Sequence, residues 1–345
     1  MDKVHTFILS PDWKMIQEIS KLDRFDASWS VIEKREGQSL KQLKSIATVR
    51  SVGASTRIEG SAMSDEEVKV VIDKLSISKL EDRDSQEVVG YFEALELISE
   101  SYGNMDISEG TIKNLHKILM KYSQKDEWHR GNYKQHSNAV EARRQDGTRS
   151  VIFQTTPPGF ETEDAMRALI EWWYNDTGTH TIVKCALFCY DFVSIHPFQD
   201  GNGRLSRLIA SLLLLKNGYS WIQYVSFEHE IENRKTEYYQ ELMQSQKQRP
   251  RENIYSWVLF FLDCLTNISS QLMEKLTTHG SISGLGEKEK RVYRFIENHP
   301  GSRSGDISEK LDMMLPTVKK ILATLVIHKH IIKHSAGAGT NYTIS

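Results

Sequence analysis

One short segment, residues 196–207, gathers side chains that can bind phosphate and move protons. It reads HPFQDGNGRLSR and contains one histidine, one carboxylate, two glycines and two arginines. Gly201 and Gly203 allow the backbone to approach a ligand closely and to turn its N–H groups towards it. The helix that follows adds the positive end of its dipole, so the segment is typical of an anion-binding loop.

The charged residues of this segment suit a chain of phosphates. Arg204 and Arg207 are spaced i, i+3, so both guanidinium groups can face the same phosphate chain. Asp200 is the one carboxylate in an otherwise cationic loop, which favours a divalent cation held against phosphate oxygens. His196 comes directly before the proline that ends its helix, and this position indicates a general base that works near neutral pH.

Helices are predicted on both sides of this loop, over residues 181–194 and 205–216. The second is apolar nearly all round, which predicts a buried central helix. Helical spacing of apolar residues recurs around Leu40, Val88 and Ile112, so the predicted fold is mainly α.

One segment, residues 137–159, breaks the helical pattern. Two strand-like runs flank Asp146-Gly147, and Pro157-Pro158-Gly159 closes the segment. This order of residues predicts a β-hairpin within a helical domain.

The loop resembles the signature of the Fic family, HPFx(D/E/N)GNGRxxR, at every specified position. The resemblance implies a Fic-type helical core over about residues 106–270, which transfers AMP from ATP to a Ser, Thr or Tyr hydroxyl of a protein. It implies that His196 deprotonates the acceptor hydroxyl and that Asp200 binds Mg²⁺ between the α- and β-phosphates. It further assigns packing of the loop to Phe198, and ATP binding to Gly201, Asn202, Gly203, Arg204 and Arg207.

The resemblance also gives roles to the hairpin and to a pair of tyrosines. Fic enzymes carry a β-hairpin flap that holds the target segment as an added strand, and a merely structural hairpin is the alternative here. Tyr238 and Tyr239 lie where Fic sequences often supply an aromatic contact to the nucleoside. Core packing explains such a pair equally well.

A second motif, STRIEG at residues 55–60, resembles the (S/T)xxxE(G/N) inhibitory motif of many Fic proteins. Ser55 and Glu59 are spaced i, i+4 and share one face of a helix, and Gly60 marks the end of that helix. The resemblance implies that Glu59 forms a salt bridge with Arg207 and holds ATP in an unproductive pose. The alternative is a solvated helix face, and in some Fic proteins the same glutamate helps to remove AMP from targets.

The C-terminal part of the sequence has a different character. A glycine- and serine-rich stretch near 277–287 predicts a domain boundary, and from Glu287 onwards ten Lys and Arg face six Asp and Glu. Three short helices and two strands are predicted after it, which resembles a winged helix-turn-helix over residues 284–345. Its candidate recognition helix, 317–329, carries Lys319 and Lys320, so duplex DNA is one candidate partner and a protein contact is the other.

Composition bounds the remaining possibilities. The chain has 345 residues, 44 Lys and Arg, 46 Asp and Glu, and a net charge of −2. These values are ordinary for a folded protein of two or three domains, and they exclude a disulfide-stapled scaffold. We expect a helical region over 1–105 before the Fic core. The three cysteines favour a reducing compartment, and no signal sequence or membrane span is recognised, so a cytoplasmic location without membrane contact is predicted.

Two classes of function stay open at this point. One is an autoinhibited protein adenylyltransferase that uses ATP and Mg²⁺, and the other is a DNA-binding regulator with the Fic core as a nucleotide sensor. The intact His196 favours the enzyme. Within the enzyme class, a phosphotransferase or a de-AMPylase variant of the same fold is an alternative. Fic cores frequently self-associate, and the aromatic residues 172–174 are either a homodimer contact or a buried cluster.

Overall fold

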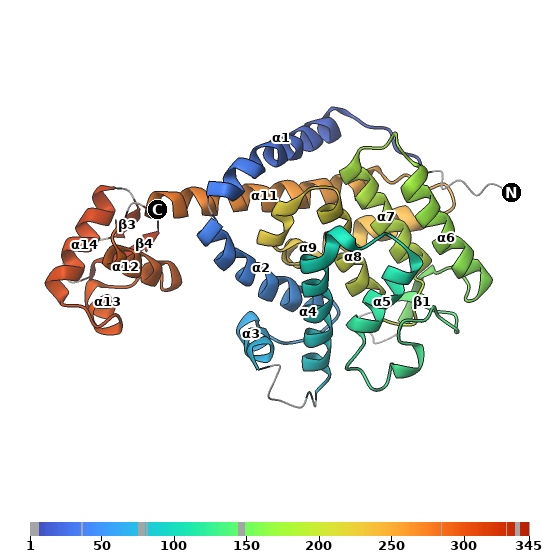
Figure 1. Ribbon diagram of the computed structural model, residues 1–345, viewed down its shortest axis with the longest axis horizontal. Coiled ribbons are helices and arrows are strands. Elements are labelled where there is room, and N and C mark those ends of the chain that lie inside the picture. Colours follow the sequence, from blue (N-terminus) through green and yellow to red (C-terminus); the bar gives the residue numbers. More distant parts are fainter. Residues whose placement is uncertain are drawn as a thin grey trace. The chain divides into compact units, whose positions relative to one another are not determined.

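The structure is a computed structural model that describes residues 7–35, 37–74, 80, 82–143, 149–283, 285–328, 330–334 and 339–344. The chain divides into two compact units, Met1–Ser270 and Gln271–Ser345. Helices dominate both units, which confirms the predicted mainly α fold (Figure 1). Among the described residues, no helix is long and apolar enough to span a membrane.

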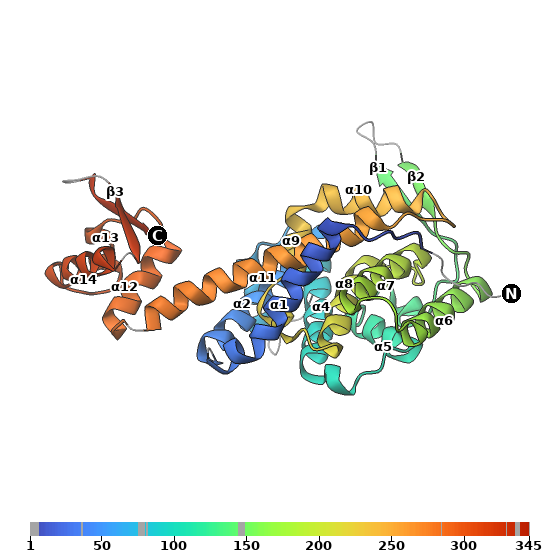
Figure 2. The ribbon, with the colours of Figure 1, turned by 90° about the horizontal axis from the view of Figure 1, so that it is seen from above.

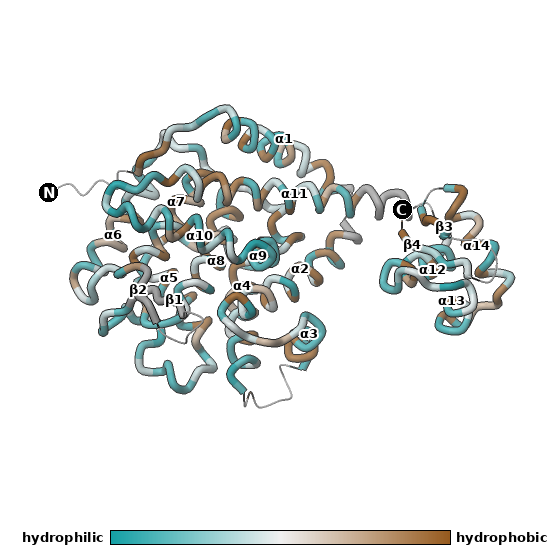
Figure 3. The backbone as a smooth tube through the Cα atoms, turned by 180° about the vertical axis from the view of Figure 1, so that it is seen from behind, coloured by the Kyte–Doolittle hydropathy of each residue, from teal (hydrophilic) through white to brown (hydrophobic). Residues whose placement is uncertain are grey.

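The centre of the N-terminal unit is a pair of buried helices, α7 (Thr181–Ile195) and α8 (Asn202–Lys216). Nearly every side chain of both helices is buried, and their apolar stretches run through the interior (Figure 3). The helix α8 starts three residues earlier than the sequence predicted. The reason is Gly201, whose φ of 79° turns the chain so that the helix begins directly after it.

Further helices surround this pair. The long helices α2 and α4 pack on one another and on α8, and α5 packs on α4 and α8. Their inner faces contain buried residues such as Leu43, Val88 and Leu115. Ile46, which shares the predicted apolar spacing, is 43% exposed. The spacing therefore predicted the helix correctly but not every residue of its buried face. The helical elements of this unit are α1 (Trp13–Arg35), α2 (Gly37–Ile58), α3 (Asp65–Asp73), α4 (Arg83–Ser101), η1 (Tyr102–Asn104), α5 (Glu109–Leu119), η2 (Glu127–His129), α6 (Phe160–Asn175), η3 (Ser220–Tyr224), α9 (Phe227–Asn233), α10 (Lys235–Gln246) and α11 (Tyr255–Ser283).

The predicted hairpin is present as strands β1 (Ala139–Arg143) and β2 (Arg149–Gln154). The two strands pair antiparallel, with an irregularity in register between Val140 and Glu141. The strand β2 lies beside α10 (Figure 2). The predicted turn at Asp146-Gly147 lies outside the described residues.

The aromatic residues 172–174 do not form one buried cluster. Trp173 is 8% exposed and packs edge-on against Phe188, whereas Tyr174 is 56% exposed. Homodimer formation through this segment stays a prediction. Cys185, Cys189 and Cys264 are free and buried in this unit.

The C-terminal unit contains α12 (Glu287–Asn298), α13 (Ser304–Lys310), α14 (Leu315–Ile327), β3 (Ile331–His334) and β4 (Asn341–Ile344). The helices pack around Val292, Ile296, Val318 and Leu322, and the two strands pair antiparallel. Helix α11 continues to Ser283, so the stretch expected to lack periodicity is helical over most of its length. Extending an existing helix through a few glycines and serines costs only about 1 kcal/mol per glycine, far less than starting a new helix.

Candidate active site

The segment 196–207 forms the loop between α7 and α8. His196 ends α7 in a left-handed conformation with φ of 54°, and Pro197 follows it. The backbone N–H of His196 still reaches Phe192, so the histidine is fixed at the last turn of a buried helix. Phe198 is fully buried, as the resemblance implied, and ties the loop to the core.

Asn202 closes the loop with its own side chain. Its Oδ1 accepts from the backbone N–H of Phe198 at 2.9 Å, and its Nδ2 donates to the carbonyl of Phe198 at 2.8 Å. The side chain is 1% exposed. Asn202, which the resemblance assigned to ATP binding, therefore holds the shape of the loop in this structure. The approach of Gly201 and Gly203 to a ligand stays a prediction.

The general base candidate has one of its two ring nitrogens engaged. Nδ1 of His196 lies 3.2 Å from the carbonyl oxygen of Val193, so this nitrogen carries the proton and donates it. Nε2 is then the acceptor of the ring, as a base requires. Burial lowers the pKa of His196 to about 4, so the ring is neutral and able to accept a proton near neutral pH.

A second histidine, His116 on α5, supports the loop and was not found by sequence reasoning. Its Nδ1 accepts from the backbone N–H of Gly131 at 2.9 Å, so Nε2 is the protonated nitrogen and donates to the carbonyl of Asp200 at 3.0 Å. The ring stacks on Phe198 with 3.9 Å between ring centroids. A polar residue on the apolar face that carries Ile112 and Leu115 was the available signal.

Lys134 joins the hairpin to the end of α7 and also escaped sequence reasoning. It is 2% exposed, and burial lowers its pKa to about 8. Its Nζ donates to Oδ1 of Asn138 at 3.0 Å, to Oγ1 of Thr155 at 2.8 Å and to the carbonyl of Ile195 at 3.1 Å. The lysine therefore ties both ends of the hairpin to the residue that precedes His196.

The two arginines of α8 face different elements. The guanidinium of Arg204 lies 3.2 Å from the carboxylate of Glu87 on α4 and 3.8 Å from that of Asp200. Arg207 donates to Oε1 of Glu59 at 2.7 Å. Burial works against the charge of Arg207, but the Glu59 carboxylate and the three tyrosines around the guanidinium together outweigh burial and raise the pKa above its ordinary value.

The structure brings the 55–60 motif to the loop. Helix α2 ends at Ile58, and Gly60 turns the chain with φ of 109°. A Cβ atom on Gly203 would collide with the Glu59 carboxylate, so this glycine is what allows the two segments to meet. The side chain of Glu59 is 30% exposed, whereas that of Arg207 is 2% exposed.

The tyrosine pair of α10 lies beside Arg207. Tyr238 is 4% exposed and packs on Trp257 and Phe260, which accounts for it as a core residue. Burial raises the pKa of Tyr239, and the charge of Glu59 raises it further, so this ring is close to the carboxylate. The structure thus places both tyrosines near Arg207 and Glu59 and gives Tyr238 a packing role, and contact of the pair with the nucleoside stays a prediction.

Asp200 fits a metal that binds together with phosphate. Its side chain is 43% exposed. Burial raises the pKa of its carboxyl, but Arg204 and the N–H of Gly201 outweigh burial and leave the pKa below its usual value. The described residues contain no cluster of three or more metal-binding side chains. Mg²⁺ commonly takes one or two carboxylates plus phosphate oxygens, so a single ionised Asp200 suits it.

The chain is similar to known proteins over part of its length. The family model of the Fic/DOC family matches residues 106–214. Proteins named protein adenylyltransferase Fic are similar over part of the chain. The Culex quinquefasciatus protein is 26% identical over 186 residues, and the Nematostella vectensis protein is 27% identical over 171 residues. The matched part covers 52% and 48% of this chain but only 34% and 37% of those proteins.

Solved structures share the fold. A Fic family protein from Desulfovibrio desulfuricans superposes with a TM-score of 0.65 at 24% identity, over 97% of both chains. A Fic domain protein from Bacteroides thetaiotaomicron superposes with a TM-score of 0.55 at 21% identity, over 75% of this chain and 94% of that one. The chain therefore carries a Fic/DOC-family domain, matched over residues 106–214.

Proposed function

We propose that this protein transfers AMP from ATP to a hydroxyl group of a protein side chain, with Ser, Thr and Tyr as the candidate acceptors. The observation that carries the proposal is the state of His196. Its Nδ1 donates to the carbonyl of Val193, so the neutral ring offers Nε2 as a base at the start of the glycine-containing loop 196–207. The similarity to proteins named protein adenylyltransferase supports the same reaction class.

In the proposed reaction the acceptor hydroxyl loses its proton to Nε2 of His196. The oxygen of the acceptor hydroxyl forms a bond to the α-phosphorus of ATP. The bond between that phosphorus and the oxygen that bridges it to the β-phosphate breaks, and pyrophosphate leaves. The loop amides and the start of α8 stabilise the negative charge of the phosphates. Asp200 would hold Mg²⁺, which supplies positive charge against the phosphate oxygens. The last turn of α7 and the bond to Val193 fix His196 before the substrate arrives, and such positioning supplies much of the rate in phosphoryl transfer.

We also propose that Glu59 inhibits this activity by occupying Arg207. The guanidinium of Arg207 is buried, whereas the carboxylate of Glu59 is partly exposed at the end of α2. A carboxylate and a phosphate compete for the same donors of an arginine, so only one of them binds at a time. Removal of Glu59 should therefore free Arg207 for the distal phosphates of ATP.

The test follows label from α-phosphate-labelled ATP with Mg²⁺ into protein. We expect Glu59→Gly to raise incorporation about tenfold or more, because the Glu59 carboxylate no longer competes with the phosphate for the buried guanidinium of Arg207. The added substitution His196→Ala should abolish it. Glu66→Gly, which removes an exposed carboxylate from the next helix, is the matched control.

Other labels decide between the remaining options. Transfer of a γ-label would show a phosphotransferase, and loss of label from pre-modified protein that requires Glu59 would show AMP removal. Equal or lower incorporation by Glu59→Gly would refute the proposed inhibition, and no label in any variant would favour a nucleotide sensor.

We propose duplex DNA as a second partner, through the C-terminal unit. Lys319 and Lys320 are exposed on α14, and Arg303, Lys319 and Lys333 line a groove of about 730 Å³. Cations of this kind contact phosphates and make binding salt-dependent. Replacing both lysines by alanine in the full chain should weaken retardation of duplex DNA at low salt. No retardation of the unaltered protein would leave a protein contact as the function of this unit.

A further inference from the structure

Arg57 lies inside the 55–60 motif, at a position that the motif leaves unspecified, and its side chain is directed away from that of Glu59. Residues two apart on a helix do not face the same side. The Nε of Arg57 donates to Oε1 of Glu232 on α9 at 2.6 Å, and its Nη2 donates to Oε2 of the same carboxylate at 3.0 Å. Such a bidentate pair fixes both groups in one geometry.

The third nitrogen of this guanidinium, Nη1, reaches the segment that leads into α3. It donates to the carbonyl of Met63 at 2.9 Å and lies 3.0 Å from Oδ1 of Asp65, the first residue of α3. A Cβ atom on Gly53, one turn earlier in α2, would lie 2.6 Å from Nη1 and 2.7 Å from Oδ1 of Asp65. The pair therefore lies directly on the bare backbone of Gly53, which accounts for a glycine at a position where alanine would favour the helix.

The last turn of α2 is a closed unit that links Arg57 to Glu59. The N–H groups of Glu59 and Gly60 donate to carbonyls of this turn at 3.1 Å each, and Gly60 ends the helix in a left-handed conformation. The carbonyl of Ile58 accepts from Nζ of Lys235, the first residue of α10, at 2.6 Å. A displacement of the turn at Arg57 therefore also displaces the backbone of Glu59.

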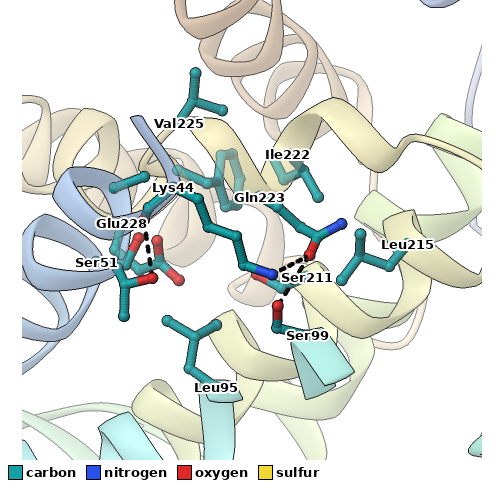
Figure 4. A pocket seen from close by; sticks show the side chains of 13 residues that line it. Lys44, Ser51, Leu95, Ser99, Ser211, Leu215, Ile222, Gln223, Val225 and Glu228 are labelled. Atoms are coloured by element: carbon teal, nitrogen blue, oxygen red, sulfur yellow. Dashed lines mark hydrogen bonds between the residues drawn. The ribbon is translucent and has the colours of Figure 1, made fainter. Parts of the chain in front are cut away.

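The body of α2 is held by other contacts. Figure 4 shows that the ammonium group of Lys44 points to Gln223 of η3. Lys44 donates to Oε1 of Gln223 at 2.9 Å, and Ser99 of α4 donates to the same oxygen. Further along α2, Oγ of Ser51 donates to Oγ of Ser226, which caps α9, at 3.0 Å. Loss of the contacts at the end of α2 would therefore loosen the last turn and leave the rest of the helix in place.

The contacts at the end of α2 form a clamp, which we define by Arg57, Asp65, Glu232 and Lys235. It joins the last turn of α2 to α3, α9 and α10. The side chains of Arg57 and Glu232 are only 20% and 22% exposed, so water and salt screen their attraction less than that of a surface pair. Burial raises the pKa of Glu232, but the bonds and charge of Arg57, together with His229, outweigh it and leave the pKa below its usual value.

We propose that this clamp positions Glu59 for its contact with Arg207, and that Arg57 is the positioning residue on which it depends. A carboxylate that is already held beside the guanidinium loses little freedom when it binds, so it competes well with phosphate. The clamp thereby sets how strongly Glu59 inhibits. This inference rests on the proposed inhibition by Glu59 and adds the residue that sets its strength.

The first test needs no nucleotide and no activity. Amide hydrogen exchange of the full chain is followed by mass spectrometry in a peptide over residues 58–63 and in one over 44–54. Arg57→Ala should accelerate exchange about tenfold in 58–63 and leave 44–54 unchanged, since it removes the charged bonds of the last turn alone. Lys121→Ala is the matched control, because it removes a lysine–carboxylate pair with Glu93 elsewhere in the same unit. Unchanged exchange of 58–63 in folded Arg57→Ala would overturn the proposal.

Gly53→Ala separates the clamp from the general stability of α2. The added methyl group displaces Nη1 of Arg57 and the carboxylate of Asp65, and both are ends of flexible side chains, so the fold tolerates the change. The same substitution raises the helix propensity of α2. If the clamp holds the turn, exchange of 58–63 should rise about threefold or more. Slower or unchanged exchange would mean that helix stability alone holds the turn and would overturn the proposal, also where Arg57→Ala fails to fold.

The second test measures ATP affinity and asks whether the clamp acts through Glu59. Arg57→Ala alone should tighten ATP binding about tenfold, because a loosened Glu59 competes less with the phosphates. In the Glu59→Gly background the same substitution should change ATP affinity by less than about twofold, since no carboxylate is left to position. An equal change in both backgrounds would show an effect on the pocket itself and contradict the proposal.

Failure of the proposed inhibition gives a different pattern. If Glu59→Gly neither tightens ATP binding nor raises label transfer, the inhibition is refuted, and the effect of the clamp on it is refuted as well. If Glu59→Gly tightens ATP binding and Arg57→Ala does not, the inhibition stands and the proposal for Arg57 is overturned.

Discussion

Replacing His116 by glutamine should make the N-terminal unit less sensitive to acid. The imidazole is fully buried, accepts from Gly131 through Nδ1 and donates to the carbonyl of Asp200 through Nε2. Burial lowers its pKa from 6.5 to about 4. A glutamine keeps an N–H donor on a side chain of similar reach, but it does not titrate.

The sign follows from proton binding in the two states. Between pH 6.5 and about 4 the unfolded chain binds a proton at His116 that the folded protein does not bind. The contribution of a neutral His116 is therefore fully present above pH 6.5 and is lost as the pH falls towards 4. A pKa difference of this size corresponds to about 3 kcal/mol of unfolding free energy at most. The pKa of His196 is lowered to about 4 as well, so the wild-type protein should lose stability from both groups.

Tryptophan fluorescence isolates the relevant unit, because all seven tryptophans lie before residue 271. Urea unfolding is followed from neutral pH down to about pH 5 for wild type, His116→Gln and the exposed control His136→Gln. At neutral pH, His116→Gln should cost about 1–3 kcal/mol, from the lost stacking and the lost acceptor for Gly131. Below pH 6.5 its unfolding free energy should fall less steeply than that of wild type.

An equally steep decline in wild type and His116→Gln would refute the reasoning, since it would mean that His116 does not bind its proton differently in the folded and unfolded states. A steeper decline in the variant would contradict the assigned tautomer as well.

Three further predictions concern the loop and its supports. In the Glu59→Gly background, label transfer should persist to about pH 5, because the pKa of His196 is lowered to about 4; loss of transfer near pH 6.5 would argue against this base. Lys134→Met removes three hydrogen bonds at the base of the hairpin, so transfer to protein should fall about tenfold while ATP affinity changes less than about twofold; an equal loss of both would place Lys134 at the nucleotide. Asn202→Ala removes both bonds to Phe198 and should lower the unfolding free energy by about 1–3 kcal/mol in urea, and an unchanged midpoint would show that the loop holds its shape without them.

Local residue types were sufficient to find the loop and the helices beside it. Gly201 permits a left-handed turn wherever it occurs, and the spacing of Arg204 and Arg207 has the same meaning on any helix. The order of helices, hairpin, helices and strands also follows from short-range patterns. The helix α8 begins three residues before its predicted start, because the turn is made at Gly201 and the sequence does not show which of the two glycines makes it.

The supports of the loop were decided by tertiary structure alone. His116 and Asp200 are 84 residues apart, Lys134 and Ile195 are 61 apart, and Arg207 and Glu59 are 148 apart. The last of these pairs was expected only through resemblance to a family, and Glu87 beside Arg204 was not expected at all. Such pairs depend on how α2, α4 and α5 pack against α8, because side chains distant in sequence meet only where the packed helices bring them together. The sequence by itself thus determined which chemistry the loop can perform, and the packing of the helices decided which buried groups hold that loop and its arginines in place.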